Sequence, residues 1–143
     1  MVIMAVDLGL ARTGVAFCDA AQTLAFPKTV IAEHNMPRLV DKLCALAQSE
    51  HAERIVVGYP RNVDGSAGGR AETCAELAEQ IGALSGIETV LRDERYTTVS
   101  AHIALNSADV RGKKRKAAVD AVAATIILQD YLDYLRNTSS TNV

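Results

Sequence analysis

The segment "VIMAVDLGLARTGVAFCD", residues 2–19, decides the fold class. Its apolar start, residues 2–6, predicts a buried strand. Residues 13–19 predict a second strand after a turn that contains glycine. Asp7 follows the first strand at once, and a carboxylate there is costly unless a cation meets it. The segment therefore predicts a strand–turn–strand unit whose acid needs a positive partner.

The chain continues with one more strand and then alternates helices and strands. Residues 24–32 predict the third strand of an antiparallel meander, and Pro27 favours an edge position or a bulge there. Asn35 and Pro37 are typical of a helix start, before apolar residues at helical spacing. Further strands are expected at 54–59 and 88–92, and further helices at 70–84, 99–105 and 117–135. This order predicts an α/β fold with a mixed five-stranded sheet, covered by helices on both faces.

The size of the chain fits one folding unit. With 143 residues we expect a single domain over residues 1–136 and a polar, disordered tail over 137–143. The three cysteines are far apart and form no CxxC pair, which favours reduced, mostly buried thiols. The start has no basic leader and no apolar run approaches a membrane span, so we expect a cytoplasmic protein without membrane contact.

Basic residues concentrate in one short segment of a chain whose net charge is −2. Five of the six residues in "RGKKRK" are cationic: Arg111, Lys113, Lys114, Arg115 and Lys116. We expect this segment to be a charged loop that clamps a phosphate backbone. The alternative is a solvated loop without a partner.

Acidic residues at the ends of elements are the candidate catalytic groups. Asp7 closes the first strand, Asp93 and Glu94 close the last strand, and Asp120 lies among alanines and valines early in the final helix. Ligands collect beyond the carboxyl ends of parallel strands, so these acids are expected to meet there. Strand alternation makes only one of Asp93 and Glu94 a ligand, and composition does not choose between them.

Clustered carboxylates repel one another, and divalent cations relieve that repulsion. Oxygen ligands favour Mg²⁺ or Mn²⁺, and two such ions roughly 4 Å apart can clamp both oxygens exchanged in phosphodiester hydrolysis. Arg12 could steady the scissile phosphate or neutralise Asp7. Arg70 could meet a phosphate beside helix N-terminal amides or pair with a nearby acid.

With these residues identified, the sequence resembles the YqgF-type pre-16S rRNA nucleases, also described as Holliday-junction-resolvase-like proteins. Four motifs carry the resemblance in order: "DLGLARTGVA", "VVGYPRNVDGSAGGRA", "DERYTT" and "AAVDAVAATIILQDYL". The resemblance implies a ribonuclease H-like fold and a metal-dependent nuclease that acts in ribosomal RNA maturation. It places the catalytic, metal-binding acids at Asp7, Glu94 and Asp120, and so prefers Glu94 to Asp93.

Other functions remain open at this level. A DNA junction resolvase would use the same acids, and a nucleic-acid-binding protein without activity would keep the basic segment. A phosphotransferase of the actin and hexokinase type needs two such domains, which 143 residues do not supply. The expected partner is therefore RNA or structured DNA, and a weak homodimer is compatible with either.

Overall fold

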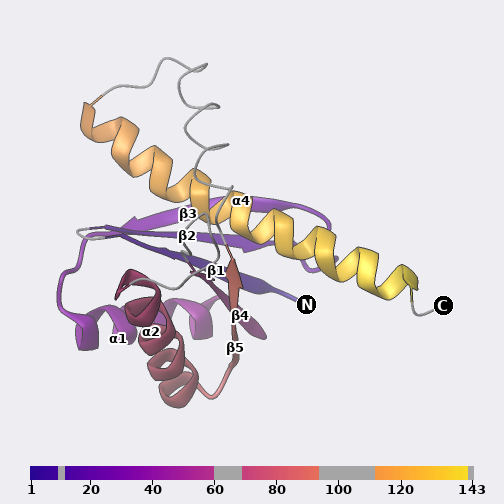
Figure 1. The fold of residues 1–143 in the computed structure, drawn as a ribbon, viewed down its shortest axis with the longest axis horizontal. Coiled ribbons are helices and arrows are strands. Elements are labelled where there is room, and N and C mark those ends of the chain that lie inside the picture. The colour runs from indigo at the N-terminus through magenta and orange to yellow at the C-terminus, as the bar shows by residue number, and fades with distance from the viewer. Residues whose placement is uncertain (10–11, 60–68, 94–111, 142–143) are drawn as a thin grey trace.

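We analysed a computed structural model that describes residues 1–9, 12–59, 69–93 and 112–141, with side chains over 1–9, 12–58, 71–92 and 122–137. The described elements follow the expected order (Figure 1). The strands are β1 (Ile3–Leu8), β2 (Thr13–Cys18), β3 (Ala25–Ile31), β4 (Arg54–Tyr59) and β5 (Glu88–Asp93); the helices are α1 (Met36–Ser49), α2 (Gly69–Ser85) and α4 (Gly112–Thr141). The helix expected at 99–105 lies outside the described residues.

The five strands form one mixed sheet in the order β3-β2-β1-β4-β5. The pairs β1–β2 and β2–β3 are antiparallel, whereas β1–β4 and β4–β5 are parallel. The predicted fold class is therefore confirmed. The expectation for Pro27 is also confirmed, because β3 is an edge strand and its register with β2 shifts between Val15 and Ala16, where Ala16 pairs with Pro27.

The two faces of the sheet bury different helices. Along β1, Met4, Val6 and Leu8 join the core that contains buried residues of α1 and α2, whereas Ile3 and Ala5 join the core that contains buried residues of α4. Figure 1 shows α1 and α2 on one side of the sheet and α4 on the other. Each strand thus presents alternate residues to the two helix layers, as the pleat requires.

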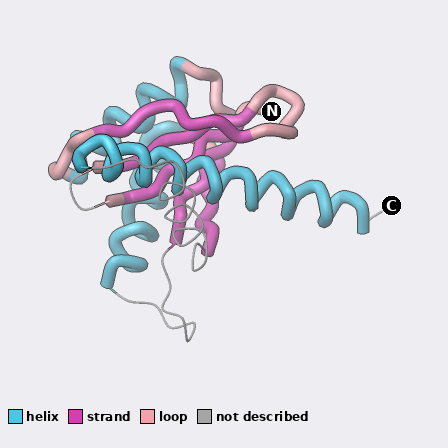
Figure 2. Tube along the Cα trace, turned by 90° about the horizontal axis from the view of Figure 1, so that it is seen from above, coloured by secondary structure: helices cyan, strands magenta, loops and turns pink. Residues whose placement is uncertain are grey.

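Helix α4 is longer at both ends than the sequence predicts. It begins at Gly112 rather than at residue 117, so Lys113, Lys114, Arg115 and Lys116 are helical and not in a loop. It ends at Thr141, so residues 137–141 are also helical, contrary to the expected disordered tail. Residues 113–143 contain neither glycine nor proline to stop a helix, and lysine, arginine and alanine are strong helix formers. Figure 2 shows the C-terminal end of α4 projecting beyond the sheet.

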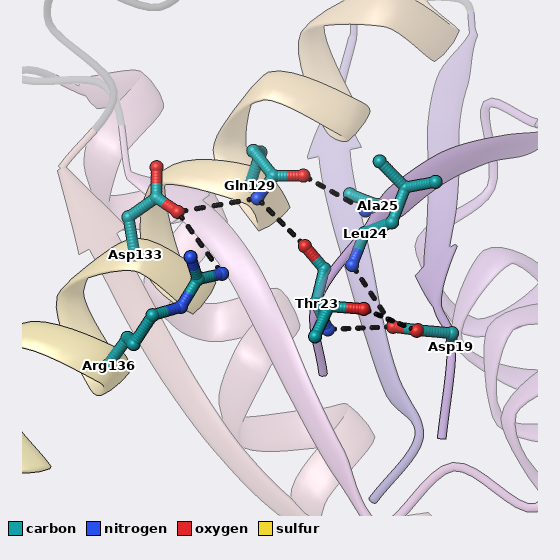
Figure 3. A network of polar contacts seen from close by, with 7 residues as sticks. All are labelled: Asp19, Thr23, Leu24, Ala25, Gln129, Asp133 and Arg136. Carbon is teal, nitrogen blue, oxygen red and sulfur yellow. Dashed lines mark hydrogen bonds and ion pairs between the residues drawn. The ribbon is translucent and has the colours of Figure 1, made fainter. Parts of the chain in front are cut away.

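A polar network ties α4 to the hairpin between β2 and β3 (Figure 3). The side chain of Gln129 accepts a hydrogen bond from the Ala25 amide (3.0 Å) and donates one to the Thr23 carbonyl (3.4 Å). Within the hairpin, the Asp19 carboxylate accepts bonds from the amides of Thr23 (2.8 Å) and Leu24 (3.0 Å). The network fixes one flank of α4 to the start of β3. None of the helices in the described part of the chain is long and apolar enough to cross a membrane.

Candidate active site

Asp7 stands near the carboxyl end of β1 and faces the layer that contains α4. It shares the alternation of Ile3 and Ala5, which pack in the α4 core, and it is half-buried. Its partner across the antiparallel ladder is Gly14. On the other side, Val6 pairs with Val57, so the neighbour of Asp7 on β4 is Gly58. Both glycines are buried. Neither flanking strand places a side chain beside this carboxylate.

The turn after β1 depends on a close backbone approach at Gly9. A Cβ atom at this position would lie 2.1 Å from the carbonyl oxygen of Arg12, which is shorter than any tolerated contact. Glycine is therefore required for the chain to reverse between Asp7 and β2. Arg12 itself is half-buried at the end of this turn, five residues after Asp7.

Helix α4 runs back along β1, in the opposite direction, as Figure 1 shows. Gln129 bonds to Ala25, which pairs with Cys18, and Cys18 Sγ accepts a hydrogen bond from the Ile3 amide at the start of β1. From Gln129 to residue 120 the helix axis covers roughly 13 Å. From Ile3 to Asp7 the strand also covers roughly 13 Å. The backbone at Asp120 thus extends toward the end of the sheet where Asp7 stands.

Small side chains line the contact between α4 and the middle of the sheet. Ala5 of β1 and Ala16 of β2 are fully buried in the same cluster as Ala124 of α4. Alanine on both surfaces lets the helix and the sheet approach more closely than leucine would. Ala123, next to Ala124 in α4, is also buried. A close approach of α4 also shortens the gap between Asp7 and the backbone of residue 120.

The end of β5 carries an interaction that the sequence analysis missed. Val90 packs in the α4 core, and Arg92 donates a hydrogen bond from Nε to Asp130 Oδ2 of α4 at 2.9 Å. Arg92 therefore pairs with an acid of α4. Leu91, which lies on the opposite face of this edge strand, is 43% exposed. Strand alternation was the signal available for Arg92, because Val90 shares its face.

The remaining predicted site residues are described only in part or not at all. Glu94 and Arg111 lie outside the described residues. The backbone places Asp120 in α4, places Lys113, Lys114, Arg115 and Lys116 in its first turns, and places Arg70 second in α2. Among the residues with described side chains, no three acids, histidines or cysteines lie close enough together to hold a metal ion. Of the three predicted metal ligands, that set includes Asp7 alone.

The chain matches the sequence model of one protein family over residues 1–134, the family described as RuvX: Holliday junction resolvase. Two relatives carry the name "Putative pre-16S rRNA nuclease". The one from Bacillus cytotoxicus is 41% identical over 137 residues, which is 93% of this chain and 98% of the relative. The one from Carboxydothermus hydrogenoformans is 37% identical over 134 residues, which is 94% of this chain and 97% of the relative.

Solved structures with a similar fold include two resolvases. RuvC of T. thermophilus, in complex with a Holliday junction substrate, superposes with a TM-score of 0.62 at 12% identity and covers 96% of this chain and 97% of its own. The fowlpox virus resolvase in complex with junction DNA gives a TM-score of 0.57 at 10% identity, covering 94% and 99% of the two chains. At these identities the likeness concerns the fold, which is the one that the sequence predicts.

Proposed function

The chain belongs to the RuvX family of Holliday junction resolvases, and from that premise we propose that it is a metal-dependent nuclease that acts on pre-16S rRNA. The relatives with 37–41% identity over almost their full length carry the corresponding name. The observation that carries the proposal is the placement of Asp7. It is an acid at the carboxyl end of a central strand, flanked by glycines on both neighbouring strands and approached by the helix that contains Asp120.

Asp7, Glu94 and Asp120 are the residues that we assign to the metal site. Residue 94 shares its parity with Val90 and Arg92, the residues of β5 that contact α4, and this supports Glu94 over Asp93. The residues fit a hard divalent cation because they supply carboxylate oxygens, and the strand positions that flank Asp7 are the glycines Gly14 and Gly58. Bound Mg²⁺ or Mn²⁺ would supply an activated water and would neutralise charge at the scissile phosphate.

The basic residues at the start of α4 are proposed to bind the nucleic-acid backbone. Cations in the first turn of a helix oppose its macrodipole, and α4 has no acid there to offset them. Helix stability therefore gives no reason for Lys113, Lys114, Arg115 and Lys116 to stand at this end. The same helix carries Asp120 about one turn further on. Phosphate contacts from these side chains, with Arg12, Arg70 and Arg111, would hold the substrate beside the acids.

The substrate test compares two nucleic acids at equal concentrations. The purified protein is incubated with a duplex from the 5′ end of precursor 16S rRNA or with a four-way DNA junction, in Mg²⁺ or Mn²⁺. We expect cleavage of the RNA. Preferential cleavage of the junction would instead support the alternative that the family description favours, a DNA resolvase. In that case two copies of the chain are expected on the symmetric substrate.

The residue test compares Asp7→Asn with Asp41→Asn, an exposed acid on α1. Asp7→Asn is expected to lower the cleavage rate by more than about a hundredfold, the upper effect of losing a group that only supports a metal ligand. Asp41→Asn is expected to cleave normally. If Asp7→Asn cleaves at the wild-type rate in protein free of contaminating nuclease, the metal site is not at Asp7.

A further inference from the structure

Three consecutive residues of α4 bond to three different strands. Gln129 bonds to the start of β3, Asp130 bonds to Arg92 of β5, and Tyr131 accepts a hydrogen bond from Arg54 of β4 (3.0 Å). Consecutive residues of a helix point about 100° apart, so these contacts hold the helix from both flanks. These three hydrogen bonds fix α4 to three of the five strands of the sheet.

The Arg92–Asp130 pair is part of a set of contacts that links α4 to β4 and to the edge strand β5. The Arg92 guanidinium lies 4.6 Å from the ring centroid of Tyr134, which stacks on Tyr131 with 6.2 Å between centroids. At the other end, Arg54 also pairs with Glu88 at 3.1 Å. Arg54 of β4 therefore contacts Tyr131, and Arg92 of β5 contacts Tyr134, the two stacked tyrosines of α4. A planar guanidinium suits both the carboxylate and the aromatic face.

Arg92 also lies in the same row of the sheet as Asp7. It pairs with Gly58, which is the β4 neighbour of Asp7, and so it stands two strands away, roughly 10 Å, on the same face. Residue 94 follows Arg92 by two positions. Asp130 belongs to the uninterrupted helix that carries Asp120. The pair therefore joins β5, which ends one residue before Glu94 in the sequence, to the helix that carries Asp120.

We infer that Arg92 and Asp130 form a positioning pair that fixes the end of β5 against α4, and that this pair determines how tightly the proposed site binds a divalent cation. This inference rests on the proposed function. The pair is partly exposed, with side-chain exposures of 27% and 47%. Exposed ion pairs contribute little to stability, so breaking this one is expected to change metal binding more than the melting temperature.

The test measures Mn²⁺ binding to the full chain without nucleic acid, by calorimetry and by electron paramagnetic resonance. Arg92→Gln and Asp130→Asn are each expected to weaken Mn²⁺ binding by about tenfold, the effect of losing a supporting partner of a metal ligand. Arg92→Lys keeps the charge and is expected to bind more tightly than Arg92→Gln. Lys42→Gln and Glu33→Gln break an ion pair of the same length, 2.9 Å, in and beside α1 and are expected to bind as the wild type does.

The outcomes separate this inference from the proposed function. If the wild type binds Mn²⁺ and Asp7→Asn does not, while Arg92→Gln and Asp130→Asn match the wild type, the inference fails and the proposed function stands. If the wild type itself binds no Mn²⁺ and cleaves no nucleic acid, the proposed function fails. Thermal melting of every variant accompanies the titrations. Equal loss of Mn²⁺ binding in the α1 controls would also overturn the inference.

Discussion

Asp7 of β1 pairs with Gly14 of β2, so the carboxylate is flanked on that side by backbone alone. On the other side, the residue of β4 beside Asp7 is also a glycine, Gly58. The carboxylate that closes this buried strand thus stands between backbone positions without side chains. The acid faces the α4 layer near the carboxyl end of a central strand, and the positions beside it on both neighbouring strands are glycines.

The first prediction concerns these two glycines. Gly14→Ala and Gly58→Ala each add a Cβ atom beside Asp7. We expect each variant to weaken Mn²⁺ binding and to slow cleavage by about tenfold or more, the effect of disturbing a group that supports a metal ligand. Calorimetry and a cleavage assay measure the two effects. Gly82→Ala is the matched control, because it lies in α2 and its new Cβ would meet Thr89 Oγ1 at an ordinary 3.4 Å. Mn²⁺ binding at the wild-type affinity by both site variants would show that the cation does not lie beside these glycines.

The second prediction separates steric clash from backbone strain. Gly9→Ala places a Cβ atom 2.1 Å from the Arg12 carbonyl oxygen, so the β1–β2 turn must move and we expect loss of both stability and cleavage. Gly86→Ala places its Cβ in open space but at a φ of +72°, which costs about 1 kcal/mol of unfolding free energy. It is expected to lower the melting temperature while cleavage stays normal. Normal cleavage by Gly9→Ala would mean that the turn does not position Asp7.

Local patterns predicted most of the fold correctly. Apolar runs and glycine-containing turns located the strands, and the edge position of β3 followed from Pro27, because proline cannot donate to a ladder. The predicted ends of α4 were wrong. At its start, a cluster of charged residues suggested a loop, although lysine and arginine favour helices. The absence of glycine and proline after residue 112 was the better predictor of the length of this helix.

The candidate site was predictable only as a list of acids. Asp7 could be placed at a strand end from sequence, and its orientation toward α4 follows from alternation. The contact between Arg92 and Asp130 was not predictable, because the two residues are 38 positions apart and the pairing depends on how α4 crosses the sheet. Alternation indicates which face Arg92 shares with Val90, but nothing in the local sequence identifies Asp130 as its partner.

The third prediction tests the N-cap of α1, a helix on the opposite face of the sheet from α4. The side chain of Asn35 accepts a hydrogen bond from the Arg38 amide at 3.0 Å and begins α1, as the sequence predicts. Asn35→Ala is expected to lower the free energy of unfolding by about 1 kcal/mol, measured by urea denaturation. Asn35→Asp keeps an acceptor and should retain most of that stability. A change in cleavage rate with either variant would contradict the placement of the site on the other face of the sheet.

The last prediction concerns the pH dependence of stability at the β2–β3 hairpin. Hydrogen bonds from the Thr23 hydroxyl (2.6 Å) and from the amides of Leu24 and Thr23 lower the pKa of Asp19 from 3.8 to about 2. Because the folded-state pKa is depressed, the ionised carboxylate stabilises the fold above pH 3.8, and this contribution is lost as the pH falls toward 2. Asp19→Asn should therefore melt below the wild type at pH 7, and the gap should close between about pH 4 and pH 2. Thr23→Val removes the hydroxyl donor and raises the folded-state pKa of Asp19 toward its ordinary value, so the acid-induced loss of stability should be smaller and complete at a higher pH. Parallel melting curves for Asp19→Asn and the wild type across this range would mean that the Asp19 carboxylate does not stabilise the hairpin.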